Sequence, residues 1–191
     1  MSKSRLGILG GAFDPPHVGH VELARAACAH FSLQSLLVLV VADPGHKATI
    51  APAAARLELA RLAFSDLPNA QIELDQHART VDWLEEHRPR DAVFILGGDE
   101  LAAFAGWKDP ERVLELVTLG VAMRPGVSEA ALREARARLS APERVSLFPM
   151  TLQPVSSSDV RASIARAESV DGLVPPEVED AIERLGLYRA Q

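Results

Sequence analysis

The sequence has very little cysteine and no long apolar run, and each shortage excludes a class of protein. Its 191 residues include one cysteine, Cys28, which excludes an internal disulfide framework and any zinc site built from several cysteines. No run approaches the roughly 20 apolar residues that span a bilayer, and no apolar segment of the signal-peptide kind follows the N-terminus. We therefore expect a cytoplasmic protein with no membrane partner.

Positive charge is also in short supply. The chain has 20 Lys and Arg against 26 Asp and Glu, which gives a formal net charge of −6. An acidic chain binds polyanions poorly, so we expect no nucleic-acid partner. The length, with 48% hydrophobic and 24% charged residues, is typical of a globular protein. We expect a single domain over residues 1–191.

Short apolar runs alternate along the chain with stretches of helical periodicity. Strands are predicted at 6–9, 36–41, 72–74, 92–96, 117–123 and 145–148. Helices are predicted at 17–31, 53–64, 80–87, 110–116, 130–139, 157–167 and 177–185. This alternation predicts an α/β fold, a doubly wound and mostly parallel sheet of the dinucleotide-binding type with C-terminal helices. Ligands of such folds bind outside the carboxyl ends of the strands.

The first strand–helix junction carries the most informative segment, G-G-A-F-D-P-P-H-V-G-H. Gly10 and Gly11 permit a tight turn and a close approach of a ligand to the backbone. We expect Asp14 to cap the following helix, and Pro15 and Pro16 to lie in its first turn. The N-terminus of that helix favours a phosphate group.

His17 and His20 are three residues apart and so share a face of this helix, with Gly19 between them removing bulk. Taken singly, either histidine could be a capping or core residue, and the pair could bind a metal. No cysteine cluster or glutamate pair at metal spacing accompanies them, which disfavours the metal. The segment also lacks the GK[ST] ending of a P-loop and the G-x-G-x-x-G fingerprint.

A second candidate anion site opens a later helix. Ser156 is placed to cap it, with Asp159 at the capping-box position. Ser157, Ser158 and Arg161 add two hydroxyls and a guanidinium beside the helix N-terminus. The simpler alternative is a well-capped helix without a ligand.

The two segments together resemble the nucleotidyltransferase superfamily. The first is most similar to the nicotinate-nucleotide adenylyltransferase family, with its form G-G-x-F-D-P-x-H-x-G-H, and the second resembles that family's I-S-S-T-x-I-R. The resemblance implies that His17 and His20 bind the ATP phosphates and stabilise the transition state, and that Arg161 and the three serines hold the β- and γ-phosphates. It also implies an ATP site that includes Gly10, Gly11, Phe13, Gly97, Asp99, Ser156, Ser157 and Ser158.

Three further segments extend the resemblance. Residues 43–47 are similar to the family's P-P-H-K loop, with Gly45 in place of a proline, which implies that Lys47 contacts the triphosphate and His46 the substrate. Residues 94–101 resemble I-G-x-D-x-L and include Asp99, whose alternative role is to cap the next helix. Residues 124–126 match R-P-G, which implies that Arg124 holds a substrate phosphate.

The segments implied to bind the pyridine ring include one departure from the family. Residues 104–107 match F-x-x-W, which implies that Trp107 stacks on the ring. Residues 78–84 align with S-Y-T-x-D-T-L and retain Thr80, but Arg79 replaces the tyrosine and Trp83 a threonine. We hypothesise that Arg79 contacts the pyridine carboxylate or a nearby phosphate. The alternative is a solvent-facing arginine, and Trp83 is expected in the core.

The resemblance implies adenylyl transfer from ATP to nicotinate mononucleotide, giving deamido-NAD and pyrophosphate by direct in-line attack of the substrate phosphate. Mg²⁺ is expected to arrive with ATP, without a metal site built by the protein. Alternatives are an adenylyltransferase for nicotinamide mononucleotide or phosphopantetheine, a nucleotide-binding sensor without turnover, and an NAD-dependent dehydrogenase. The oligomeric state is open, with a homodimer as one arrangement.

Overall fold

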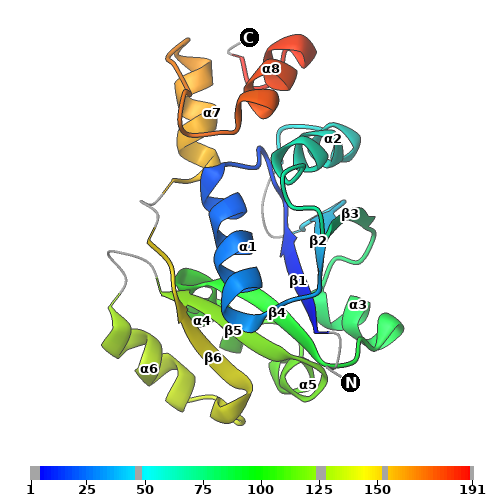
Figure 1. Cartoon of the computed structure of the whole chain (residues 1–191), viewed down its shortest axis with the longest axis vertical. Helices are drawn as coiled ribbons and strands as arrows, with labels where there is room; N and C mark the ends of the chain where they lie inside the picture. Colours follow the sequence, from blue (N-terminus) through cyan, green and yellow to red (C-terminus); the bar gives the residue numbers. More distant parts are fainter. Residues whose placement is uncertain (1–4, 46–48, 124–127, 152–154, 190–191) are drawn as a thin grey trace.

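A central sheet of six parallel strands, in the order β3-β2-β1-β4-β5-β6, organises the fold (Figure 1). The computed structural model describes residues 5–45, 49–123, 128–151 and 155–189. The strands are β1 (Leu6–Gly11), β2 (Ser35–Val41), β3 (Ala70–Asp75), β4 (Ala92–Gly97), β5 (Thr118–Met123) and β6 (Val145–Pro149). The strand order reverses direction at β1, as in doubly wound folds, and the predicted fold class is confirmed.

Helices cover both faces of the sheet and extend beyond one end of it. One face carries α1 (Val18–Phe31) and α2 (Ala53–Ala63). The other face carries α3 (Thr80–His87), α4 (Gly98–Ala103), η1 (Phe104–Gly106), α5 (Pro110–Leu116) and α6 (Glu129–Ala137), while η2 (Pro142–Arg144) precedes β6. Beyond the carboxyl end of β1 lie α7 (Ser157–Ala165) and α8 (Pro176–Leu185), at the top of Figure 1.

The central strands are largely apolar because both of their faces are buried, whereas the edge strand β3 alternates apolar with exposed polar residues. Along β4, Val93 and Ile95 belong to the apolar cluster shared with α1 and α2. The alternating residues Phe94 and Leu96 belong to the cluster shared with α3, α4 and α5. Two-sided burial of parallel strands gives the uninterrupted apolar runs from which the sequence predicted them.

The first strand ends later than predicted. Gly10 and Gly11 are its last two residues, and the turn falls instead at Phe13, which has a left-handed φ of 50°. A Cβ atom would lie 3.3 Å from the Phe94 ring at Gly10 and 3.1 Å from the Phe13 ring at Gly11. The glycines make room for these two rings, so their predicted role in a tight turn is wrong.

The first helix begins at Val18, with His17 as its N-cap residue. Pro15 and Pro16 therefore precede the helix, and their predicted place in its first turn is wrong. The short α4 was not predicted, because six residues carry too little periodicity to identify a helix. Within the described ranges, no helix is long and apolar enough to cross a membrane.

Candidate active site

A cleft of about 1080 Å³ opens at the carboxyl ends of the strands, beside the N-termini of α1 and α7. This is the position at which doubly wound sheets bind ligands. The predicted site residues that the structure brings together here are Gly10, Gly11, Phe13, His17, His20, Arg79, Thr80, Gly97, Asp99, Trp107, Ser156, Ser157, Ser158 and Arg161. The predictions for His46, Lys47 and Arg124 lie outside the described residues.

The two histidines at the start of α1 are held in a defined arrangement. Their rings stack with centroids 3.7 Å apart and an interplanar angle of 27°. The Phe13 and His20 rings meet edge to face, with centroids 5.0 Å apart. The backbone N–H of His17 donates to Nδ1 of His20 at 3.2 Å. Because that Nδ1 accepts a hydrogen bond, a neutral His20 ring carries its proton on Nε2. The ring is thereby prepared to donate a hydrogen bond from Nε2.

Gly19 lies where the first and second candidate anion sites meet. A Cβ atom at this position would be 2.9 Å from Nδ1 of His17 and 3.1 Å from Cγ1 of Val155. Val155 immediately precedes the cap of α7. A side chain at position 19 would therefore push the α7 segment away from the histidines.

The cap of α7 is formed as predicted. Ser156 Oγ accepts the backbone N–H of Asp159 at 3.1 Å and donates to Oδ2 of the same residue at 2.6 Å. Ser157 Oγ donates to the carbonyl oxygen of Pro15 at 2.8 Å, which ties α7 to the segment before α1. The hydroxyl protons of Ser156 and Ser157 are therefore directed to protein acceptors.

Arg161 joins the same two segments one helical turn later. Its Nη1 donates to the carbonyl oxygen of Asp14 at 2.6 Å and its Nη2 to Ser158 Oγ at 3.2 Å. Because Ser158 Oγ accepts this bond, its own proton can be donated to a ligand. A guanidinium, a hydroxyl and the N-terminal amides of α7 thus face one side of the cleft, a donor set suited to an anion.

Asp14 does not cap α1, and that prediction is wrong. Its buried carboxylate accepts the backbone N–H groups of Ile50 at 2.6 Å and Ala51 at 3.0 Å, and the hydroxyl of Tyr188 at 2.8 Å. The carboxylate satisfies amides of the segment before α2, which would otherwise be costly to bury. Burial, followed by the hydrogen bond to Asp14, raises the pKa of Tyr188 well above its usual range.

Arg56 is 1% exposed, and it connects the segments that follow β1 and β2 by hydrogen bonds. Its Nη1 donates to the carbonyl oxygens of Ala12 at 2.7 Å and Val41 at 2.8 Å. Its Nη2 donates to Ala42 at 2.7 Å, and its Nε to Ala51 at 3.1 Å. Burial lowers the pKa of Arg56.

Neither the role of Arg56 nor the contact made by Tyr188 was predicted from the sequence. A signal for Arg56 was present: it occupies the buried helical stripe that continues with Leu59, Ala60 and Ala63. An arginine on an apolar stripe is expected to find partners in the interior. The partner of Tyr188 is 174 positions away along the chain, and no local pattern could identify it.

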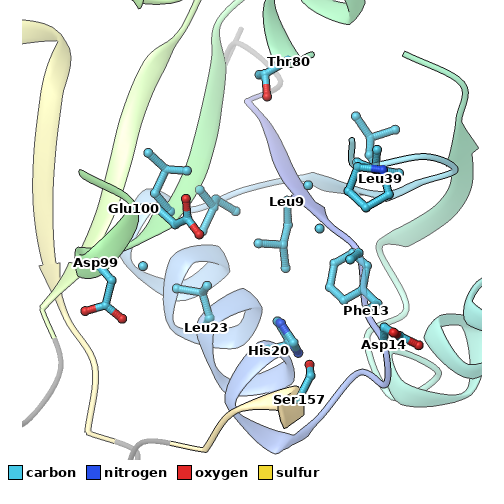
Figure 2. A pocket seen from close by; sticks show the side chains of 18 of the residues that line it. Leu9, Phe13, Asp14, His20, Leu23, Leu39, Thr80, Asp99, Glu100 and Ser157 are labelled. Atoms are coloured by element: carbon cyan, nitrogen blue, oxygen red, sulfur yellow. The ribbon is translucent and has the colours of Figure 1, made fainter. Parts of the chain in front are cut away.

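The opposite side of the cleft is aromatic and acidic. Trp107 follows η1. The centroid of its ring lies 5.2 Å from that of Phe104 and 6.1 Å from that of Phe94. Gly97 is the N-cap residue of α4, so Asp99 lies in the first turn of that helix and does not cap it. Figure 2 shows Asp99 and Glu100 on one side of the pocket and His20 on the other. The donors are therefore concentrated at the α1 and α7 side.

The remaining wall lies at the start of α3. Arg79 is the N-cap residue of this helix, is exposed, and donates from Nη1 to the carbonyl oxygen of Ala78 at 3.1 Å. Thr80 follows it and also lines the cleft. Trp83 is buried in the core, as predicted. Arg79 therefore lies at the rim, where both interpretations of its role still apply.

Comparison with known proteins places these features in a family context. The cytidylyltransferase-like family model matches residues 8–163. A Bordetella avium protein named as a probable nicotinate-nucleotide adenylyltransferase is 39% identical, with 97% of this chain and 98% of that protein covered. A Thermomicrobium roseum protein of the same name is 38% identical, with 97% and 92% covered.

Solved structures share the fold. The Plasmodium falciparum nicotinic acid mononucleotide adenylyltransferase complexed with NaAD aligns with a TM-score of 0.72, covering 97% of each chain. Its sequence is 15% identical to this one, so this likeness concerns the fold.

Proposed function

Because the chain belongs to the cytidylyltransferase-like family and, within it, to the nicotinate-nucleotide adenylyltransferases, we propose that its cleft joins ATP to nicotinate mononucleotide. The products are deamido-NAD and pyrophosphate. The observation that carries this proposal is the meeting of two anion-binding helix starts, α1 and α7, through the bond from Arg161 to Asp14. A polyphosphate is the ligand that such a paired site suits.

The chemistry is a single displacement at the α-phosphorus of ATP. A phosphate oxygen of nicotinate mononucleotide forms the new P–O bond, and the bond from the α-phosphorus to the bridging oxygen of pyrophosphate breaks. The attacking phosphate is already an anion at neutral pH, so no general base and no covalent enzyme intermediate are needed. Catalysis then consists of positioning and of stabilising the charge that develops on oxygen.

The histidines and the α7 segment have separate roles in this proposal. His17 and His20 donate to the phosphate oxygens around the reacting phosphorus, and the hydrogen bond at Nδ1 of His20 directs its Nε2 proton to that task. Arg161, Ser158 and the N-terminal amides of α7 hold the β- and γ-phosphates, which leave as pyrophosphate. Gly10, Gly11, Phe13, Gly97 and Asp99 line the space for the rest of the nucleotide.

The mononucleotide occupies the side of the cleft that carries Trp107, Arg79 and Thr80. The indole of Trp107 offers a flat face for the pyridine ring. Arg79 supplies a cation at the rim, suited to the pyridine carboxylate or a phosphate. By the family resemblance, Lys47 contacts the triphosphate, and His46 and Arg124 contact the mononucleotide.

Mg²⁺ enters with ATP and supplies further charge neutralisation on its phosphates. Among the described residues, no three histidine, cysteine or acidic side chains come together as a metal site. We further propose that the chain acts as one nucleotidyltransferase domain in the cytoplasm.

Pyrophosphate release tests the proposal. ATP is supplied with nicotinate mononucleotide, nicotinamide mononucleotide or phosphopantetheine in parallel, and ATP alone is the control. We expect the highest kcat/KM with nicotinate mononucleotide and no release from ATP alone. A preference for either other acceptor would reassign the substrate, and the absence of release with all three would overturn the enzymatic function.

A further inference from the structure

His77 lies in the loop between β3 and α3, and each of its ring nitrogens faces a carboxylate. Nδ1 is 2.7 Å from Oδ1 of Asp75, and Nε2 is 3.0 Å from Oε2 of Glu86. A carboxylate only accepts hydrogen bonds, so both ring nitrogens must donate. The arrangement, which we call the Asp75–His77–Glu86 bridge, is therefore complete only when His77 is an imidazolium.

The bridge joins two elements that border the cleft. Asp75 is the buried last residue of β3, and Glu86 lies near the end of α3. Oδ1 of Asp75 also accepts the backbone N–H of His77 at 2.8 Å, which fixes the start of the loop. The loop from residue 76 to residue 79 is thus held at the strand and, through the ring, at the helix.

The residues immediately after His77 form part of the cleft wall. Ala78, Arg79 and Thr80 all line the cleft, as does His77 itself. Arg79 also lies against the loop that follows β2, because a Cβ atom at Gly45 would be 3.5 Å from its Nη1. Displacement of the 76–79 loop would therefore move the guanidinium relative to both neighbouring segments.

The charged surroundings of His77 come from three elements. Asp75 faces it from β3 and Glu86 from α3, while Arg79 is the cation of its own loop. The ring centroid of His87, on α3, lies 6.0 Å from that of His77. Hydrogen bonding to Asp75 and then Glu86 raises the pKa of His77 above its ordinary 6.5, against a smaller opposing effect of burial.

We propose that His77 is a positioning residue for the pyridine mononucleotide, which it serves by holding the 76–79 wall through the Asp75–His77–Glu86 bridge. The identity of the ligand at this wall rests on the function proposed above. Below the pKa of His77 the bridge is complete and the wall is fixed. As the pH rises through that pKa, one nitrogen loses its proton, the contact with Glu86 is lost, and the wall loosens. ATP, bound at α1 and α7, does not sense this change.

The test compares KM values for nicotinate mononucleotide and for ATP between pH 7 and pH 9, because phosphate groups with a second pKa of about 6 are largely ionised throughout this range. In the wild type, the KM for the mononucleotide rises roughly fivefold with pH, the effect of one exposed charged hydrogen bond, while the KM for ATP stays constant. His77→Gln has the high mononucleotide KM at every pH. Glu86→Gln has the low mononucleotide KM at every pH. The amide of glutamine can accept a hydrogen bond from the charged His77 ring and donate one to the neutral ring.

His87→Gln is the matched control, since it removes a neighbouring titratable ring of α3 whose Nδ1 lies 3.0 Å from the carbonyl oxygen of Trp83 and which stacks on the Trp83 ring. It should keep the wild-type profile. A wild-type profile in His77→Gln, or an equal rise in the KM for ATP, would overturn the proposal.

Nitrogen NMR of the ligand-free protein separates this proposal from the proposed function. Both ring nitrogens of His77 should be protonated at pH 6.5, and in Glu86→Gln the ring should titrate at lower pH than in the wild type. A neutral ring at pH 6.5 in the wild type would overturn the bridge even in an active enzyme. If the protein proves inactive with nicotinate mononucleotide, the proposed function fails while these spectra still decide the state of the bridge.

Discussion

The buried Arg56 offers the sharpest test of how the cleft is held together. Replacement by methionine fills a similar volume but removes four hydrogen bonds to the carbonyl oxygens of Ala12, Val41, Ala42 and Ala51. Ala12 follows β1, Val41 ends β2, and Ala42 and Ala51 lie in the segment between β2 and α2. We expect both the stability of the fold and the geometry of the cleft to suffer.

The magnitude follows from the number of bonds lost. At about 1 kcal/mol for each net hydrogen bond, Arg56→Met should lower the free energy of unfolding by about 4 kcal/mol. For a chain of this length, that corresponds to a fall in Tm of roughly 8–16 °C.

Urea unfolding followed by circular dichroism measures this loss. Arg61→Met is the matched control, because Arg61 is exposed on the same helix, and its unfolding free energy should change by less than about 0.5 kcal/mol. A loss of under about 1 kcal/mol in Arg56→Met would mean that the four carbonyls are satisfied without the guanidinium, and would contradict its supporting role.

Three further changes probe individual groups. His20→Ala should lower kcat by about 10²-fold or more, while Tm falls by only about 2–4 °C through loss of one hydrogen bond. Near-normal turnover would remove this residue from the charge-stabilising role. Ser158→Ala should raise the KM for ATP about fivefold through loss of one hydrogen bond. Ser156→Ala should instead mainly lower the unfolding free energy, by about 1 kcal/mol, through loss of the helix cap. Equal effects of the two variants on the KM for ATP would contradict these separate roles. Tyr188 is the single tyrosine of the chain, and its pKa is raised in the folded protein. Its bond to Asp14 therefore stabilises the fold fully below pH 10, the ordinary pKa of tyrosine. This contribution to the free energy of unfolding is lost as the pH rises towards the raised pKa. Tyrosinate absorbance should therefore appear only together with alkaline unfolding, and titration of the folded protein near pH 10 would contradict the buried bond.

Much of the fold was predictable because its signals are local. Central strands such as β4 are buried on both faces and so appear as uninterrupted apolar runs. Ser156 caps α7 through an N–H only three residues away. The short α4 left no such signal, and its six residues were missed. The end of β1 was misplaced because Gly10 and Gly11 serve ring packing from Phe94 and Phe13, which a turn-based interpretation of glycine does not include.

The candidate site likewise contains residues that local sequence patterns predict and residues that they do not. The residues proposed to bind the ligand lie in short motifs, and the structure brings the described ones to a single cleft. The groups that support the cleft have distant backbone partners: Arg56 reaches 44 positions to Ala12, and Asp14 reaches 36 positions to Ile50. Asp14 in particular was assigned to the nearest helix, because sequence reasoning favours local partners over those that folding creates.

The central claim is that ATP and nicotinate mononucleotide react by one direct displacement in this cleft. The most direct measurement is the configuration at phosphorus in the dinucleotide formed from a single diastereomer of adenosine 5′-(1-thiotriphosphate). One in-line attack inverts the configuration, so we expect inversion. Retention would require two successive displacements through a covalent adenylyl-enzyme and would contradict it.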